Sequence, residues 1–594
     1  MTTNKDEWYD TTRRYTLDLV RTRSVNPSVG ESRAAEDALR LLHGDGLARA
    51  YTLSGLDPIA DDPYGRHNAY AFVQGQSRRT VVLFGHVDTV GTSDYGPLET
   101  WALDPDALAS RLDALGRLVP ELAPDLAAHP GDWMFGRGVA DMKSGVAATI
   151  AVTRRLALQA REGDLPLSVV LLAVVDEENE SAGALQGVRL LHALRERYGL
   201  EYVGAIDTDY TSARYPGDPH RYIYTGTVGK LLPSLFVVGQ TAHAGDPFAG
   251  LDVNLLVAEL VRAFSMNVDL CDAVDGHIAP PPVTLHATDL KTGYDTQLPY
   301  QAYLYLNVVT LTTTPAQLLE TLRTRVASVL DDLLARMGTA GRRWLRDQRI
   351  SSPEESITGA SPGTAGILPA TMGWQGAGDP SEYGLLQSNP SKKTLETVLT
   401  YAELHTETIR RLGAEYVGAA LDEEWRSCPL DLDSRERCLR LAQRLWTLSG
   451  RQGPAVVLYY APPYYPHVAS RQGPLRKAVE AVAAGRPELN LLVEDYFPLL
   501  SDMSYFGLDP GVDLAALRDN MPVWQAHGEQ GAPTHAGAYS LPLDAMRSLD
   551  IPVANIGPYG RDVHQPGERV LMSYSFGVVP QLLYETIERL AQLT

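Results

Sequence analysis

Histidines and acids stand at the ends of several apolar runs in this chain of 594 residues. The run VVLFGHVDTV carries His86 and Asp88, and the run VVLLAVVDEENES carries Glu177 and Glu178. Three further acids and one further histidine are placed in the same way, and these are Asp141, Asp207, Asp209 and His564. Imidazole and carboxylate groups in this number suit a pair of zinc-type ions. The pattern therefore indicates a metal-dependent hydrolase.

His86 and Asp88 are two residues apart on a predicted strand, so their side chains should point to the same face. We expect the Asp88 carboxylate to accept the spare ring N–H of His86, which leaves the other ring nitrogen for a metal. A buried His–Asp pair without a metal is the alternative, and these two residues alone do not decide between them.

Asp141 lies in GRGVADMKSG, between a glycine-rich turn and a predicted helix. Its carboxylate could bridge two cations, or it could cap the helix N-terminus. Glu177 and Glu178 follow an apolar strand, where acids are costly unless a cation neutralises them. We assign metal binding to Glu178 and proton transfer from water to Glu177; a solvated acidic loop is the alternative.

Asp207 directly follows the strand-like YVGAI and is the first choice as a ligand at that strand end. Asp209 is close behind, and we expect one of the two to have a capping or turn role. His564 lies in a glycine-rich loop after the strand-like VANIG. On its own, His564 would be interpreted as an ordinary loop residue. It becomes a metal-ligand candidate because the other candidates form a set that lacks one ligand.

Alternating apolar and amphipathic segments predict an α/β fold with a mostly parallel sheet in the first part of the chain. Such sheets bind ligands at the carboxyl ends of their strands, where all these candidates lie. The predicted strands are 70–75, 80–86, 168–175 and 202–207. The predicted helices are 6–24, 31–43, 106–128, 144–161 and 184–197.

The character of the sequence changes after about residue 225, where a β-α-β-β pattern precedes a predicted helix at 314–336. Residues 350–392 are rich in Gly, Pro and Ser, and further helices are predicted at 394–412 and 433–449. The alternating α/β pattern then returns. We predict an α+β domain of residues 226–461 inserted into a catalytic domain formed by 1–225 and 462–594.

Composition limits the partners. The chain is 44% hydrophobic and 21% charged, with a net charge of −21 and no basic block. Nucleic acid and anionic membranes are therefore not expected partners. The three cysteines, Cys271, Cys428 and Cys438, are not in metal-ligand spacing. These cysteines, together with the lack of a long apolar segment, predict a soluble cytoplasmic protein.

The motifs, taken in order, resemble the M20 family of metallopeptidases. HVDTV, GRGVADMKSG, DEENES, GTVGK, TAHAG and GPYGRDVH occur in the family's order across nearly the whole chain. The stretches YTGTVGKLLPSLFVVG, PPYYPHV and SDMSYFG resemble its arginine-utilisation, RocB-like branch. The resemblance implies a zinc-peptidase-like catalytic domain, an inserted lid that could pair two subunits, and two divalent ions. Zinc is expected, with manganese and cobalt as alternatives.

The resemblance also implies a role for each candidate. One ion would be held by His86 and by Asp207 or Asp209, and the other by Glu178 and His564. Asp141 would bridge the ions, with Asp88 behind His86. Glu177 would act as general base and then general acid. His243, in TAHAG of the inserted domain, would stabilise the developing oxyanion.

The expected substrate is a small peptide or an N-acyl amino acid, in arginine or other amino-acid catabolism. The chain departs from the family pattern in its larger insert and in the strand LYLNVVT, which lacks an arginine for a substrate carboxylate. The alternative is a catalytically silent protein with the same fold that binds an amino acid or has a regulatory role.

Overall fold

The computed structural model describes residues 5–351, 392–508, 512–524 and 538–593. The chain divides into two compact units. Unit 1 comprises 1–230, 465–512 and 527–594, and unit 2 comprises 231–464 and 513–526. The predicted boundaries lie within a few residues of these, except that 513–526 had been assigned to the catalytic domain. The Asn520 carbonyl accepts the Tyr460 amide, which ties that segment to unit 2.

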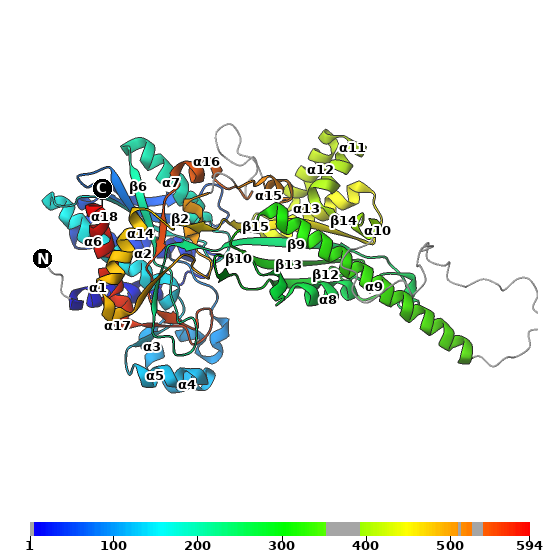
Figure 1. Cartoon of the computed structure of the whole chain (residues 1–594), viewed down its shortest axis with the longest axis horizontal. Helices are drawn as coiled ribbons and strands as arrows, with labels where there is room; N and C mark the ends of the chain where they lie inside the picture. The colour runs from blue at the N-terminus through cyan, green and yellow to red at the C-terminus, as the bar shows by residue number, and fades with distance from the viewer. Residues whose placement is uncertain (1–4, 352–391, 509–511, 525–537, 594) are drawn as a thin grey trace, which may run out of the picture. The chain divides into compact units, whose positions relative to one another are not determined.

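Unit 1 is built on an eight-stranded sheet with the order β1-β2-β5-β3-β6-β18-β7-β17. Figure 1 labels β2 and β6 of this sheet. The strands in that order are Leu53–Pro58, His67–Val73, Ser168–Val174, Arg79–His86, Glu201–Asp207, Val553–Asn555, Arg221–Tyr224 and Leu491–Glu494. The run β5-β3-β6-β18 is parallel, β1 and β2 pair antiparallel, and β7 and β17 run parallel to each other. The predicted α/β class is confirmed.

Strands β3 and β5 are almost wholly buried, as their continuous apolar sequences predict for a sheet covered on both faces. Helix α6 packs on both strands, and α7 packs on β2 and β5. Glycine at position 187 lets α7 approach Leu172 and Val174 closely. The helices of this unit include α1 (Lys5–Arg21), α2 (Gly30–His43), α6 (Ser144–Glu162), α7 (Ala182–Tyr198), α14 (Pro474–Ala484), α16 (Leu543–Leu549), α17 (Met572–Gly577) and α18 (Val579–Gln592).

The helix predicted at 106–128 is instead three short helices, α3 (Pro105–Ala109), α4 (Leu112–Leu118) and α5 (Ala123–Ala128). Pro120 and Pro124 explain the break between α4 and α5, because proline is accepted in the first turn of a helix but not in its interior. Strand β4, which follows these helices, belongs to a small sheet with the order β19-β20-β4 and the ranges Gly560–Arg561, Arg569–Leu571 and Trp133–Phe135.

Unit 2 contains a five-stranded sheet with the order β12-β13-β9-β15-β14. These strands are Val283–Asp289, Gln301–Thr310, Gly229–Val238, Ala455–Tyr465 and Val398–Thr400. Helix α8 (Val253–Phe264) packs on β12 and β13 and against α9 (Pro315–Ser351). Helices α11 (Tyr401–Leu412), α12 (Ala414–Ser427) and α13 (Ser434–Ser449) pack on one another. Of these, α12 was not predicted.

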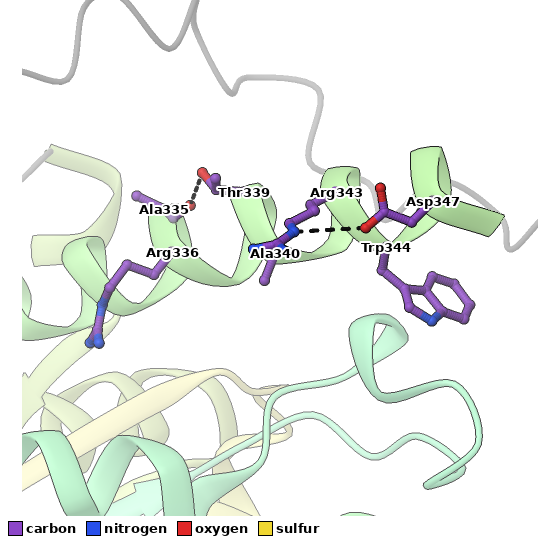
Figure 2. Close-up of a pocket in the computed structure, with 7 residues that line it drawn as sticks. All are labelled: Ala335, Arg336, Thr339, Ala340, Arg343, Trp344 and Asp347. Atoms are coloured by element: carbon purple, nitrogen blue, oxygen red, sulfur yellow. Dashed lines mark hydrogen bonds and ion pairs between the residues drawn. The ribbon is translucent and has the colours of Figure 1, made fainter. Parts of the chain in front are cut away.

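Helix α9 runs 15 residues beyond the predicted end at 336. Its outer part carries no continuous apolar face, which is why the hydrophobic pattern stopped early. Trp344 lies there, 40% exposed and 5.8 Å from the Phe248 ring. Figure 2 shows this surface, where Arg343 pairs with Asp347 at 3.7 Å. Most of the predicted loop at 350–392 lies outside the described residues.

Two findings in the described residues concern the cysteines and the possibility of a membrane-spanning helix. Within the described residues, Cys271, Cys428 and Cys438 form no disulfide. Within the described ranges, no helix has the length and apolarity needed to cross a membrane.

Candidate metal centre

The candidate ligands of unit 1 come from three adjacent parallel strands. His86 ends β3, Glu177 and Glu178 follow β5, and Asp207 ends β6. Because β3 lies between β5 and β6, their carboxyl ends meet at one edge of the sheet. The sheet topology thus brings together residues that are more than 100 positions apart in sequence.

Asp141 and His564 arrive from outside the central sheet. Asp141 lies in the turn Val139–Lys143, between β4 and α6, and His564 lies in the loop between β19 and β20. Strand β20 pairs with both β4 and β19. The small sheet therefore places these two loops side by side.

The carboxylate of Asp141 lies between the two histidines. Its Oδ1 is 2.9 Å from His86 Nε2, and its Oδ2 is 3.2 Å from His564 Nε2. His564 Nε2 is also 3.0 Å from Glu178 Oε1. Each oxygen of one carboxylate thus faces a different histidine, which is the arrangement that a bridging ligand requires.

Two groups of potential ligand atoms share Asp141. One consists of His86, Asp141 and Asp209, and the other of Asp141, Glu178 and His564; within each, the atoms lie within 4.8 Å of one another. A third group adds Glu177 to His86 and Glu178. Nitrogen and carboxylate oxygen in such groups suit zinc, manganese or cobalt.

The structure distinguishes Asp209 from Asp207, which was the first choice as metal ligand from the sequence. The carboxylate of Asp207 is already occupied, because it accepts hydrogen bonds from the Ser501 hydroxyl and, at 2.7 Å, from the Thr208 amide. Asp209 accepts the Tyr210 amide at 2.8 Å and joins the group with His86 and Asp141. The geometry therefore favours Asp209 as the ligand at this strand end.

Asp88 also differs in detail from its prediction. His86 Nδ1 makes its hydrogen bond at 3.2 Å to the backbone oxygen of Asp88, while the carboxylate Oδ1 is 3.5 Å away. The strand ends at His86, so the same-face rule for alternate residues no longer applies at position 88. The carboxylate Oδ2 accepts the Glu178 amide at 3.0 Å and the Asn26 side-chain amide at 3.2 Å.

Burial sets the electrostatics of the cluster. It raises the pKa of Glu177, of Glu178 and of Asp209, and neighbouring carboxylates add to the effect. Burial also raises the pKa of Asp207 to about 7. Several buried carboxylates that repel one another are stable together only when cations or protons neutralise them. The donor set therefore fits divalent metal ions.

Comparison with known proteins agrees with this geometry. The sequence model of peptidase family M20/M25/M40 matches residues 82–530. The chain belongs to this family. It is 30% identical over 579 residues to the uncharacterized protein YqjN of Bacillus subtilis (96% of this chain, 95% of that one). It is 30% identical over 597 residues to protein RocB of the same organism (97% and 94%).

A third relative covers less of the chain. The succinyl-diaminopimelate desuccinylase of Methylibium petroleiphilum is 31% identical over 279 residues, which is 46% of this chain and 61% of that enzyme. The predicted M20 membership and the RocB-like branch are both confirmed by these comparisons.

Two residues at the M20 site were missed in the sequence. Ser501 and Asp502 line the same hollow as His86, Glu177 and Asp209. They lie in SDMSYFG, which had been noted only as typical of the branch. Their only local signal was an acid before an aromatic segment, which is too common in sequences to indicate a site.

Glu568 is a third missed residue, and it holds the Asp141 turn. It is fully buried, and its carboxylate accepts the amides of Ala140 at 3.2 Å and Asp141 at 3.4 Å. Arg137 Nη1 donates to it at 2.7 Å. Four residues after His564, Glu568 thus links the two loops that supply Asp141 and His564.

His243 lies in unit 2 and makes its contacts there. Its Nδ1 accepts the Gly245 amide at 2.9 Å, and its Nε2 is 3.2 Å from the Thr296 hydroxyl. The side chain is exposed. Its predicted part in catalysis stays a prediction.

Proposed function

We propose that this M20-family chain hydrolyses an amide bond of a small peptide or N-acyl amino acid with two divalent ions. The observation that carries the proposal is the position of Asp141, whose two oxygens face His86 and His564 separately. A carboxylate in that position can serve two ions at once.

His86 and Asp209, with Asp141, would hold one ion, and Glu178 and His564, with Asp141, would hold the other. Zinc is the proposed metal, with manganese and cobalt as alternatives. Bound there, such ions polarise an amide carbonyl and lower the pKa of water. Asp88 supports both halves of the site through the His86 ring and the Glu178 amide.

Glu177 is the proposed general base. Its carboxylate lines the hollow, with Oε2 at 3.8 Å from His86 Nε2, outside hydrogen-bond range. The Tyr465 hydroxyl donates to the Glu177 backbone oxygen at 3.3 Å and steadies the loop. Glu177 would take the proton of the attacking water and return it to the leaving amine.

His243 is the proposed oxyanion group, which would act when unit 2 serves as a lid. Its ring is exposed, as a residue that meets substrate on closure must be. Because Thr296 contacts Nε2, a substrate oxygen would have to replace that hydroxyl.

The substrate proposal draws on the desuccinylase, whose name describes removal of an acyl group from an amino acid. The RocB likeness supports testing arginine derivatives, with a role in amino-acid breakdown in the cytoplasm. The free cysteines fit a reducing compartment.

A homodimer through unit 2 is also proposed. Strand β12 is the edge of its sheet and exposes Val283 and Leu285, at 38% and 56%. An exposed apolar edge strand favours pairing with a second strand. Sedimentation of the native chain and of Leu285→Lys should show a dimer and a monomer, respectively.

Elemental analysis of the metal-loaded protein tests the central proposal, and two ions per chain are expected. Asp141→Ala should lose both, because both groups need its carboxylate. Metal content equal to that of the parent would contradict the bridging role. A screen of dipeptides and acylated amino acids with zinc, manganese and cobalt tests catalysis. Ligand binding without hydrolysis of any amide would instead support a silent binding protein.

A further inference from the structure

A small hollow in unit 1 is lined by some of the proposed metal ligands and by further acidic residues that are not proposed as ligands. Phe84, Met142 and Val174 form its apolar part, and its polar part consists of His86, Glu177, Asp207, Asp209, Ser501 and Asp502. Neither lysine nor arginine occurs among these described lining residues. Asp207 and Asp502 are therefore buried acids without an assigned role.

Asp502 is the acid that lacks partners. It is 2% exposed, and among the described residues neither of its carboxylate oxygens has a hydrogen-bond partner. The Ser181 hydroxyl helps to lower its pKa, but that hydroxyl pairs with Tyr465 at 2.7 Å. Asp207 differs, since Ser501 and Thr208 occupy both its oxygens. A buried carboxylate without donors is costly, which indicates that a ligand supplies them.

The surroundings of Asp502 suit a positive charge. Asp207 and Asp209 line the same hollow, so Asp502 lies among other buried carboxylates. The Tyr505 hydroxyl, also buried, has no hydrogen-bond partner among the described residues. Two divalent ions would be held by Asp141, Glu178 and Asp209, which leaves Asp502 uncompensated.

We propose that Asp502 binds a positively charged group of the substrate, an ammonium or guanidinium next to the scissile amide. The inference rests on the proposed amide hydrolysis and narrows its substrate class to cationic amino-acid derivatives. The apolar floor strengthens the pairing, because charges interact more strongly where water is excluded. A neutral substrate of the same shape would leave the Asp502 carboxylate unpaired.

The cation could be an α-ammonium or a basic side chain, and three probes with one carbon skeleton distinguish these. Norleucinamide carries only the α-ammonium, N-acetyl-lysinamide carries only the side-chain ammonium, and N-acetyl-norleucinamide is neutral. Calorimetry on the zinc-loaded full chain should show one charged probe binding at least about tenfold more tightly than the neutral one. In Asp502→Asn the ratio should fall toward one, whereas the exposed Asp544→Asn should keep it.

Three results would overturn the proposal. The parent could bind all three probes alike, or Asp502→Asn could keep the preference. Asp502→Asn could also lower kcat for charged and neutral amides by one factor with KM unchanged, which would mean that it positions Glu177 instead. Thermal unfolding controls for folding, since removing an unpartnered buried charge should not lower Tm.

The failure of this inference is distinguishable from that of the proposed function. A binding preference without hydrolysis of any amide would remove the reaction and keep the cation site. Hydrolysis without any preference for a cation would keep the reaction and remove the cation site.

Discussion

The backbone amide of Glu178 donates to the carboxylate of Asp88 at 3.0 Å. Asp88 also accepts His86 Nδ1 through its backbone oxygen at 3.2 Å. One residue therefore fixes the strand end that carries His86 and the loop that carries Glu178. Because His86 and Glu178 are proposed as ligands of different ions, Asp88 joins the two halves of the site behind the metal-facing atoms.

Asp88→Ala should weaken the half of the site that contains Glu178 more than the half that contains Asp209, because alanine keeps the backbone oxygen that His86 contacts. It removes the acceptor of the Glu178 amide and of the Asn26 side chain. Loss of such supporting contacts typically lowers metal affinity by about 10–100-fold. Competition with a chelator, followed for each ion, measures this. Equal weakening of both ions would contradict this expectation and would show that the Asp88 carboxylate also supports His86.

Glu177→Gln and Glu178→Gln should lose different properties, turnover in the first and bound metal in the second. Glu177→Gln keeps the shape of the side chain and removes its basicity, so turnover should fall by about 10²–10⁴-fold with metal content preserved. Glu178→Gln should lose metal, because its carboxylate faces His564 at 3.0 Å. Elemental analysis beside steady-state kinetics separates the two. The reverse pattern would exchange the roles.

Asp209→Asn and Asp207→Asn form a matched pair. Asp209 belongs to the group with His86 and Asp141, so its amide variant should retain about one ion per chain instead of two. Asp207→Asn can keep its oxygen toward the Thr208 amide and turn its NH2 group toward the Ser501 hydroxyl, which then accepts instead of donating, and it should retain both ions. Loss of an ion only in Asp207→Asn would restore the assignment first made from the sequence.

Glu568→Gln should loosen the Asp141 turn and destabilise unit 1. It leaves Arg137 buried with Asp94 as its remaining acid partner, and breaking a buried ion pair typically costs about 3–5 kcal/mol. Urea unfolding and metal titration measure both effects. Asp94→Asn is the control, because its side chain is 32% exposed and makes no contact with the Asp141 turn among the described hydrogen bonds. Equal losses in both variants would argue against a special role for Glu568.

His243→Ala should lower turnover with metal content and affinity for a dipeptide product unchanged. The ring would act only on the developing oxyanion, and loss of one such donor typically costs about 10²–10³-fold in kcat. Thr296→Val is the control, since it removes only the hydroxyl next to Nε2. Unchanged turnover in His243→Ala would exclude the histidine from the reaction.

The sequence by itself determined the class of the site. Acids and histidines at the ends of apolar strands identified His86, Asp141, Glu177, Glu178 and His564 as members of one cluster. The rule that parallel strands carry ligands at one edge accounts for His86, Glu177 and Glu178. It does not account for Asp141 and His564, which the small antiparallel sheet brings to the site.

Only the tertiary structure decided which of two neighbouring acids faces the cluster. Asp207 and Asp209 have equivalent sequence signals, but Ser501, from a segment nearly 300 residues away, occupies Asp207 and leaves Asp209 to the ligand group. Asp502 and Glu568 were missed for the same reason. Their significance comes from burial and from partners distant in the chain, which local residue spacing does not encode.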